Sequence, residues 1–565
     1  MLMRVSAPFP GIGRGEAGLI PDHPGRAGRE LTGRPDLSDP PGFSGTRAGE
    51  RTIIRPAGIR QALCNNNTWC ARYTQTFLDT PAPGKGLSRA WDGDRQGIPH
   101  FQGGAMITFK GYDEVIRRAY DNGQGHLFDF WDRLDEGARH GLLKEIESLD
   151  FELLKKLHAL ASGESLAPMR YDPAEYIPLP ADDGAKAEWE RARVRGEEAI
   201  RSGRVAAFLV AGGQGSRLGF EGPKGMFGVG PVSGKSLFQI HAEKILKYSR
   251  KYGARVPWLI MTSEANHEDT AAYLRDHGYF GLDERDVIIF PQSMIPSMDT
   301  EGRLILEGPG RIFRNPDGHG GSLTALARSG ALAEMERRGV ETISYFQVDN
   351  PLVRILDPVF IGFHELRGAD ISSKGLMKAY PGEKIGVFVK FEDGTTGVVE
   401  YSDLPAELQE ARDGKGALRY CMGSIAIHLF GTRFIGSITG GSSLSLPFHV
   451  ARKKIRSYTG KGAADIDGFK FEKFVFDALP LTPRNLVLET LREDEFAPVK
   501  NPSGVDSAES ARALMTGQCM RWLAHRGIAL PPAVKLVEIS PLLAVEPDDI
   551  PENLSVPNEE RVYLE

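Results

Sequence analysis

The stretch that decides the fold runs from Val205 to Ile245 and has the sequence VAAFLVAGGQGSRLGFEGPKGMFGVGPVSGKSLFQIHAEKI. Its first six residues are uncharged and apolar on both faces, which is typical of a buried strand in a parallel sheet. The chain then turns through Gly212, Gly213 and Gly215, where the missing Cβ atoms let a ligand approach the backbone. Successive amide N–H groups in such a loop can form a cradle for anionic oxygens. The sequence therefore predicts a strand followed by an anion-binding loop.

Two cations follow the glycine loop within a few residues. Arg217 offers a planar, bidentate cation and Lys224 offers a point charge. A strand, a glycine loop and two cations together predict a site for a polyphosphate. Glycines that serve only tight packing at a strand–helix corner are the simpler interpretation of a lone glycine loop, but that interpretation does not account for the cations.

Two better-known phosphate motifs are not intact in this stretch. The dinucleotide fingerprint needs a glycine where Leu218 stands, and Gly219 comes one place late. The segment GPVSGKS, residues 230–236, looks like a P-loop, but the required first glycine falls on Val229 and Pro231 lies inside the turn. The predicted phosphate site therefore belongs to neither motif class.

The overall composition indicates a soluble globular chain with two or three domains. It has 565 residues, of which 25% are charged. The net charge of −6 and a pI near 6.2 argue against nucleic acid as a partner. No apolar run approaches the roughly 20 residues of a membrane span. The four cysteines show no zinc-type spacing, so we expect a reduced, cytoplasmic setting without membrane contact.

Residues 1–105 differ in composition from the rest of the chain. The first fifty residues include seven prolines and ten glycines, and the first lysine of the chain is Lys85. Such a composition is typical of disorder. A disordered leader and a misassigned start codon both fit it, with Met106 as the alternative start.

Between residues 106 and 203 the apolar residues recur at helical spacing, as Leu142, Leu143 and Ile146 do. The run Gly123-Gln124-Gly125 separates the first predicted helix from the second, and Asp135 is placed to cap the third. We expect a helical N-terminal region whose apolar stripes form a core.

Beyond the glycine loop, strands and helices alternate. The predicted strands are Trp258–Thr262, Val287–Phe290 and Thr342–Val348, and the predicted helices are Thr270–His277 and Leu323–Arg338. Strands spaced by helices predict an α/β, Rossmann-like fold with right-handed crossovers and a mixed, mainly parallel sheet. We place the nucleotide-binding catalytic domain at residues 204–450. Residues 451–565 would complete the phosphate site and form a small C-terminal domain.

Ligands of such sheets bind beyond the carboxyl ends of the strands, and two polar residues lie there. Gln292 follows one strand, and its amide carries both a donor and an acceptor, as the imide edge of uracil requires. Asp349 ends another strand, where a carboxylate can hold Mg²⁺ together with water and phosphate oxygens. A turn or helix cap before Pro351 is the other interpretation of Asp349-Asn350.

The run from Leu209 to Gly219, followed by Pro223-Lys224-Gly225, resembles the signature of UTP-dependent sugar-1-phosphate uridylyltransferases. Within them it is most similar to the eukaryotic-type UDP-N-acetylhexosamine pyrophosphorylases. The likeness extends through several motifs from about residue 112 to about residue 545. It implies a GT-A-type nucleotidyltransferase fold, UTP and a sugar 1-phosphate as substrates, Mg²⁺ as cofactor, and a monomer or weak dimer.

The resemblance also implies roles for individual residues of this chain. The residues expected to be catalytic are the cations Arg217, Lys224 and Lys470. The residues expected to bind the nucleotide are Gly212, Gly213, Gly215, Gln292, Gly318 and Asp349, of which Asp349 also holds the metal. The residues expected to bind the sugar are His319, Glu400, Gly423, Ser424 and Lys500.

The implied reaction needs no general base, because a sugar 1-phosphate is already an ionised nucleophile. It attacks the α-phosphorus of UTP and expels pyrophosphate, so the chemical difficulty is the accumulation of negative charge. Arg217 and Mg²⁺ on Asp349 would serve the leaving pyrophosphate. Lys224 and Lys470 would serve the α-phosphate and the incoming sugar phosphate.

The identity of the sugar is where this chain departs from the hexosamine pattern. That pattern has asparagine where His319, Cys421 and Ser424 stand here, and the Gly-His-Gly run is similar to UDP-glucose pyrophosphorylases. The run Glu400-Tyr401-Ser402 stays closer to the hexosamine branch. We expect N-acetylglucosamine 1-phosphate as the substrate, with glucose 1-phosphate or a broad range of sugars as the alternative.

Two other functional classes share parts of this pattern. A UDP-sugar-dependent glycosyltransferase has the same sheet architecture but usually carries Asp-x-Asp, whereas Asp349 is followed by Asn350 and Pro351. A non-catalytic UDP-sugar sensor could keep the pocket and lose the cations, yet Arg217 and Lys224 are both present.

Overall fold

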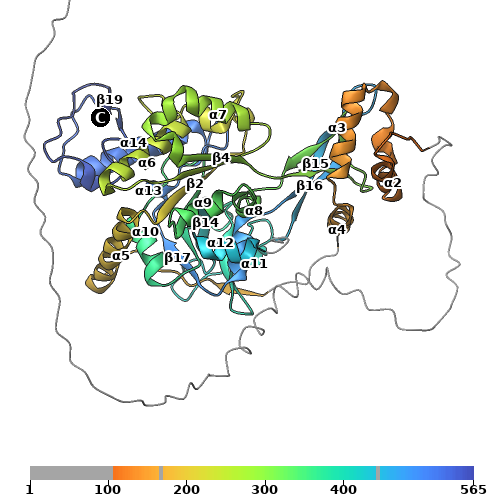
Figure 1. The fold of residues 1–565 in the computed structure, drawn as a ribbon. Helices are drawn as coiled ribbons and strands as arrows, with labels where there is room; N and C mark the ends of the chain where they lie inside the picture. The colour runs from red at the N-terminus through yellow and green to blue at the C-terminus, as the bar shows by residue number, and fades with distance from the viewer. Residues whose placement is uncertain (1–105, 164–169, 441–445) are drawn as a thin grey trace, which may run out of the picture. The chain divides into compact units, whose positions relative to one another are not determined.

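The computed structural model describes residues 106–163, 170–440 and 446–565 (Figure 1). The predictions of a disordered leader and of a start at Met106 concern residues 1–105, which lie outside the described residues. None of the helices in the described segments combines the length and the apolar character needed to cross a membrane.

A ten-stranded mixed sheet forms the centre of the described chain (Figure 1). Its main path runs β1-β12-β14-β10-β2-β3-β4, while β11, β13 and β17 pair off this path. Its strands are β1 (Tyr171–Pro173), β2 (Val205–Val210), β3 (Trp258–Thr262), β4 (Val287–Pro291), β10 (Thr342–Gln347), β11 (Ile371–Met377), β12 (Val387–Phe391), β13 (Thr396–Val399), β14 (Met422–Gly431) and β17 (Asn485–Glu489). Only β1, β13 and β14 oppose the direction of β10, so the expected mixed, mainly parallel sheet is confirmed.

The parallel part of the sheet consists of β10, β2, β3 and β4 in that order. Val210 pairs with Gln347 on one side and with Met261 on the other. Because the strands are parallel and in this register, their carboxyl ends meet at one edge. The loops that follow β2, β3, β4 and β10 therefore emerge side by side.

The two faces of the sheet carry separate apolar cores. Along β2, Ala207 and Leu209 belong to one core, while Ala206 and Phe208 belong to the other. Successive strand side chains point to opposite faces, so this alternation shows that β2 is buried on both sides. The predicted buried strand is confirmed.

Helices cover both faces. The first core includes side chains from α5 (Asp183–Arg201), α6 (Leu237–Tyr252), α10 (Pro358–Leu366) and α14 (Ala508–His525). The second includes side chains from α8 (Gly321–Arg328), α9 (Ala331–Arg337) and α12 (Thr432–Thr439). A Cβ on Gly362 of α10 would lie 1.7 Å from the Ala192 carbonyl oxygen of α5, so these two helices touch backbone to backbone (Figure 1).

Three details of the elements expected beyond the glycine loop are wrong. The single helix expected over Leu323–Arg338 is two helices, because Gly330 adopts the left-handed conformation with φ of +79° and breaks it between α8 and α9. The helix expected at Thr270–His277 is α7 (His267–Asp276), which begins three residues earlier. The strand expected to reach Val348 ends at Gln347.

The N-terminal helices are α2 (Asp113–Asp121), α3 (Glu136–Glu147) and α4 (Phe151–Ala161). Asp135 caps α3, as expected, by accepting a 2.8 Å hydrogen bond from the Ala138 amide. The second expected helix is instead a pair of 3₁₀ turns, at Gly125–Phe128 and Trp131–Arg133. The remaining helices are α11 (Ala406–Glu410) and α13 (Arg492–Glu495).

These N-terminal helices share an apolar core with segments from the middle of the chain. That core includes Ile295, Leu306, Ile312 and Phe471 together with the buried faces of α2 to α4. The segments form small antiparallel pairs. Their strands are β5 (Met294–Pro296), β6 (Met298–Asp299), β7 (Leu306–Gly308), β8 (Arg311–Ile312), β9 (Arg314–Pro316), β15 (His449–Tyr458) and β16 (Ala463–Glu472).

The C-terminal residues form their own small core around α14 and the parallel pair β18 (Leu536–Ile539) and β19 (Arg561–Leu564). Leu523 of α14 and Val537 of β18 are both fully buried in it. The division of the chain at residues 203 and 450 stays a prediction.

Candidate functional site

The glycine loop after β2 lies against the residue that follows β4. A Cβ on Gly212 would lie 2.5 Å from the Gln292 Nε2 atom, and a Cβ on Gly215 would lie 2.7 Å from the Phe220 ring. Gly213 instead faces open space and is exposed. The structure thus brings two predicted nucleotide-binding features, the loop and Gln292, into contact.

Asn266, which the sequence did not single out, holds this loop in place. Its side-chain amide donates to the Ala211 and Gly213 carbonyls at 2.9 Å and 3.2 Å, and its Oδ1 accepts from the Ser263 amide at 2.8 Å. The Lys224 amide donates to the same Gly213 carbonyl at 3.1 Å. The backbone of the loop is therefore fixed before any ligand binds.

Lys224 and Asp349 form an ion pair beside this loop. The Lys224 Nζ atom lies 2.9 Å from Asp349 Oδ2, and only 7% of Asp349 is exposed. Burial by itself would raise the pKa of Asp349, but the positive charges of Lys224 and Lys500 lower it below its usual value. The carboxylate at the end of β10 therefore stays ionised.

The segment that carries Lys500 is attached to the same turn. The Val499 amide donates to the Asp349 carbonyl at 2.9 Å. Asn350 donates to the Glu495 carbonyl at 2.6 Å and accepts from the Ala497 amide at 3.1 Å. The Asn350 side chain thus joins two parts of the backbone, and Asp349, paired with Lys224, is the carboxylate of this turn.

The second glycine turn packs against the chain just after β16. Gly318 has φ of +85°, and a Cβ there would lie 2.4 Å from the Lys473 carbonyl oxygen. His319 Nδ1 accepts a hydrogen bond from the Val475 amide at 3.1 Å, and its ring stacks on Phe474 at 5.2 Å. Burial lowers the pKa of His319 to about 4, and nearby positive charges add to this. His319 is therefore neutral and carries its proton on Nε2.

Three of the expected sugar-binding residues meet around Gly386. A Cβ on Gly386 would lie 3.3 Å from Glu400 Oε1, and the Ser424 amide donates to the Gly386 carbonyl at 2.8 Å. Gly423 pairs with Val387 across β14 and β12. Burial raises the pKa of Glu400 above its usual value, although the positive charges of His449 and Lys500 oppose this.

His449 and Asp477 form a pair in the same region that the sequence did not predict as a site. His449 Nε2 lies 2.9 Å from Asp477 Oδ2, and its ring stacks on Phe474 at 4.2 Å. Burial opposes protonation of His449, but the hydrogen bond that it donates to Asp477 and the negative charge of Asp477 raise its pKa overall. No motif could reveal this pair, because its members stand 28 positions apart.

The other two expected catalytic cations lie apart from the ion pair. Arg217 is exposed in the 3₁₀ turn Ser216–Leu218 and makes no hydrogen bond or ion pair with the described residues. Lys470 lies on β16, 5.6 Å from the Phe313 ring, and burial together with the charge of Lys453 lowers its pKa. The catalytic roles of both cations stay predictions.

The P-loop-like segment at residues 230–236 binds a carboxylate of the chain itself. Glu538 of β18 accepts hydrogen bonds from the Val232 amide, the Ser233 amide and the Ser233 hydroxyl, each at 2.7 Å. Lys235 pairs with Glu243 at 2.6 Å. The segment is therefore occupied by side chains, and its exclusion as a phosphate-binding motif is confirmed.

The site suits Mg²⁺ only as part of a complex with phosphate. No group of three or more His, Cys, Asp or Glu side chains in the described part of the chain is placed to hold a metal ion. Mg²⁺ commonly takes one or two carboxylates and completes its shell with waters and substrate phosphates. Asp349, ionised and next to the glycine loop, fits that use.

This fold defines an α/β protein with a glycine loop and an ionised carboxylate at the carboxyl edge of a mainly parallel sheet. A family model described as UTP–glucose-1-phosphate uridylyltransferase matches residues 182–540, and the chain belongs to this UDPGP family. The resemblance drawn from the glycine-loop motif is confirmed.

Individual relatives lie in the N-acetylhexosamine branch. The chain is 36% identical over 460 residues to UDP-N-acetylglucosamine diphosphorylase 2 of Arabidopsis thaliana, covering 77% of this chain and 90% of the relative. It is 39% identical over 433 residues to UDP-N-acetylhexosamine pyrophosphorylase-like protein 1 of Xenopus tropicalis, covering 73% and 84%.

Solved structures agree with the fold. The uridine diphosphate N-acetylglucosamine pyrophosphorylase of Trypanosoma brucei, in complex with an inhibitor, matches with a TM-score of 0.68 and 28% identity. The match covers 79% of this chain and 95% of that chain. UDP-glucose phosphorylase of the same organism shares the fold alone, with a TM-score of 0.52 and 17% identity over 67% of this chain and 79% of that chain.

Proposed function

We propose that this protein transfers the uridylyl group of UTP to N-acetylglucosamine 1-phosphate and releases pyrophosphate. The observation that carries the proposal is the Lys224–Asp349 pair at 2.9 Å, next to a glycine loop in which Gly213 faces open space. The relatives named UDP-N-acetylglucosamine diphosphorylase and UDP-N-acetylhexosamine pyrophosphorylase-like protein support the choice of reaction.

The residues of the chain bind and orient the reactants rather than move protons. An oxygen of the sugar 1-phosphate forms a bond to the α-phosphorus of UTP, and the bond from that phosphorus to the pyrophosphate oxygen breaks. The amides of the glycine loop and the Lys224 ammonium would hold the phosphates. Arg217 and Lys470 would add charge at the pyrophosphate and at the incoming phosphate. Mg²⁺ bound at Asp349 would supply further charge neutralisation.

The base and the sugar would lie on opposite sides of this centre. Gln292, 7% exposed and touching the loop at Gly212, would bond the uracil edge. His319, Glu400, Gly423 and Ser424 would bind the sugar, with neutral His319 donating from Nε2. Lys500 lies close enough to Asp349, His319 and Glu400 to affect all three pKa values, which suits a cation between the phosphate and the sugar.

Glucose 1-phosphate is the second candidate for the sugar, because His319, Cys421 and Ser424 stand where the hexosamine pattern has asparagine. We further propose a cytoplasmic monomer or weak dimer that binds no nucleic acid. Two cysteines without a disulfide, Cys421 and Cys519, and the acidic net charge support this setting.

The test is release of pyrophosphate from UTP with a panel of sugar 1-phosphates and Mg²⁺. We expect turnover with N-acetylglucosamine 1-phosphate, and a comparison with glucose 1-phosphate in the same assay decides the sugar. If no sugar 1-phosphate released pyrophosphate, the proposal would fail. A glycosyltransferase would release UDP from a UDP-sugar instead, and a sensor would bind without turnover.

A further inference from the structure

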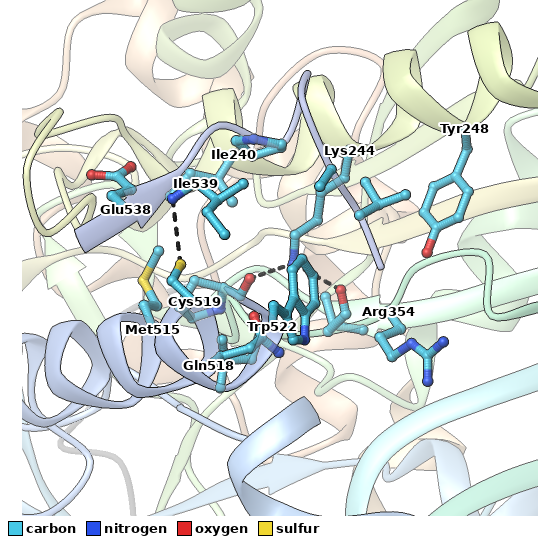
Figure 2. A pocket seen from close by; sticks show the side chains of 16 residues that line it. Ile240, Lys244, Tyr248, Arg354, Met515, Gln518, Cys519, Trp522, Glu538 and Ile539 are labelled. Carbon is cyan, nitrogen blue, oxygen red and sulfur yellow. Dashed lines mark hydrogen bonds between the residues drawn. The ribbon is translucent and has the colours of Figure 1, made fainter. Parts of the chain in front are cut away.

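Two side chains of helix α6 bond to the backbone on either side of Asp349. His241 of this helix donates from Nε2 to the Val348 carbonyl at 3.1 Å. One turn later, Lys244 donates from Nζ to the Pro351 carbonyl at 2.5 Å and to the Val353 carbonyl at 2.9 Å. Figure 2 shows the Lys244 side chain reaching down to these two oxygens beside Trp522.

The three carbonyls bonded by His241 and Lys244 lie on both sides of Asp349 in the sequence. Val348 comes immediately before Asp349, while Pro351 and Val353 follow it. A backbone turn with carbonyls fixed on both sides cannot rotate without breaking at least one of these bonds. Since Asp349 Oδ2 also bonds Lys224, the two lysines hold the same turn from its side chain and from its backbone.

Burial of the Lys244 amine against neutral carbonyls costs free energy that a purely structural contact would not require. Both of its hydrogen-bond partners are neutral carbonyls, so no carboxylate bonded to it offsets its charge. Burial, with a smaller contribution from the positive charge of Arg354, lowers the pKa of Lys244 to about 7 against the opposing charge of Glu495. The Lys244 Nζ atom can donate to both carbonyls at once, which suits a position where backbone geometry matters.

A cavity beside Lys244 leaves space for a different side chain at position 244. Lys244 lines a cavity of about 50 Å³ between α6, the 351–354 segment, α14 and β18 (Figure 2). Trp522 and Cys519 form part of its wall. A larger side chain at position 244 can therefore be accommodated, and this allows a conservative rescue variant.

We propose that Lys244, together with His241, positions the Asp349 turn and so fixes the Lys224–Asp349 geometry that uridylyl transfer requires. The inference rests on the proposed function, but it concerns residues other than those proposed to bind the nucleotide and the sugar. Lys244 and His241 act through Asp349 and are positioning residues.

The test compares Lys244→Met, which removes the donors, with Lys244→Arg, which keeps two N–H donors. Displacing a reacting group by about 1 Å can cost about 10²-fold in rate. We expect Lys244→Met to lower kcat by about tenfold to a hundredfold and to weaken Mg²⁺–UTP binding in calorimetry, with KM for the sugar 1-phosphate nearly unchanged. Lys244→Arg should restore most of both losses.

Lys247→Met is the matched control, because Lys247 lies on the same helix and makes no hydrogen bond or ion pair with the described residues. It should behave as wild type. His241→Leu against His241→Gln repeats the comparison at the Val348 carbonyl, since only Gln keeps a donor near Nε2. This second pair keeps the proposal testable if Lys244→Met does not fold.

Equal kcat and equal Mg²⁺–UTP affinity in the donor-free variants and wild type would overturn the inference. A fall in melting temperature with unchanged kcat would do the same, because it would show a structural role only. Failure of the proposed function differs from both outcomes, since wild type itself would then release no pyrophosphate.

Discussion

Lys224 Nζ lies 2.9 Å from Asp349 Oδ2, although the two residues are 125 positions apart in the sequence. The pair joins the loop after β2 to the turn after β10, and these strands are neighbours in the parallel part of the sheet. Each side chain therefore neutralises the charge of the other. Removing one charge leaves its partner partly buried without compensation.

We expect Lys224→Met and Asp349→Asn each to lower kcat by about 10²–10³ at saturating UTP and Mg²⁺, because each removes a charged contact to the reacting phosphates. The double variant should lose less than the product of the two single losses, since residues in contact are not independent. Steady-state pyrophosphate release measures this. Near-normal turnover in either single variant would remove that residue from the mechanism.

Lys235→Met is the control for loss of a lysine charge near this region. Lys235 pairs with Glu243 and lies in the P-loop-like segment, which is not among the predicted site residues. Its replacement should lower stability and leave kcat within about twofold of wild type. If kcat fell as far as in Lys224→Met, the P-loop-like segment would have a role that its occupied geometry does not indicate.

Glu538 should contribute to stability and not to turnover. Its carboxylate accepts three hydrogen bonds from Val232 and Ser233, and it joins the C-terminal core to the loop before α6. We expect Glu538→Gln to lower the free energy of unfolding by about 1–3 kcal/mol, because an amide cannot accept all three bonds. Urea unfolding measures the loss, with the exposed Glu552→Gln as control. An unchanged free energy of unfolding would contradict this role.

Much of the fold was predictable because strand positions depend on local pattern. The buried runs at residues 205–210 and 258–262 coincide with β2 and β3. The break at Gly330 was not predictable, since the apolar spacing continues through it and a glycine inside a helix costs only about 1 kcal/mol. What breaks the helix is a left-handed backbone conformation, which the spacing of side chains does not encode.

The sequence allowed us to predict which loops carry the candidate site, but not which pairs of side chains contact each other in it. A parallel sheet places residues such as Gln292 and Asp349 at one edge, so their neighbourhood follows from strand order. The His449–Asp477 bond and the Asn266 contacts with the glycine loop depend on how distant segments pack. Single residues of these types give no signal in a sequence unless a motif surrounds them.

Asp317 should make stability depend on pH. It is 6% exposed, its Oδ1 makes no hydrogen bond within the described residues, and burial raises its pKa to about 6 against the opposing charge of Lys473. Between about pH 4 and pH 6 the folded state therefore binds more protons at this site than the unfolded state. Its contribution to stability falls as the pH rises through that window.

Replacement of Asp317 by Asn should remove this dependence. Relative to wild type, the variant should gain up to about 2–3 kcal/mol of unfolding free energy between pH 4.5 and pH 7.5, since one pKa unit corresponds to about 1.4 kcal/mol. Urea titrations at the two pH values measure the difference, with the exposed Asp465→Asn as control. A gain that is the same at both pH values would show that Asp317 is not protonated in the fold.

The last prediction concerns the choice of sugar. His319 uses Nδ1 to accept from Val475, so only its Nε2 remains to face a substrate, and that nitrogen is a donor. An asparagine at this position could accept the Val475 hydrogen bond and still offer two N–H groups. Together with Cys421 and Ser424, this changes the hydrogen bonds available to an acetamide, and each bond lost there costs about 1–3 kcal/mol.

We therefore expect wild type to prefer N-acetylglucosamine 1-phosphate over glucose 1-phosphate by less than about a hundredfold in kcat/KM, which corresponds to about 2.7 kcal/mol. His319→Asn should increase this preference, while a Tyr380→Phe control, at an exposed residue, should leave the ratio unchanged. The two sugars are compared side by side with UTP. A wild-type preference above a hundredfold would mean that other groups in the pocket bind the acetamide. A ratio that His319→Asn does not move would place His319 outside sugar recognition, with only its bond to Val475 left as its role.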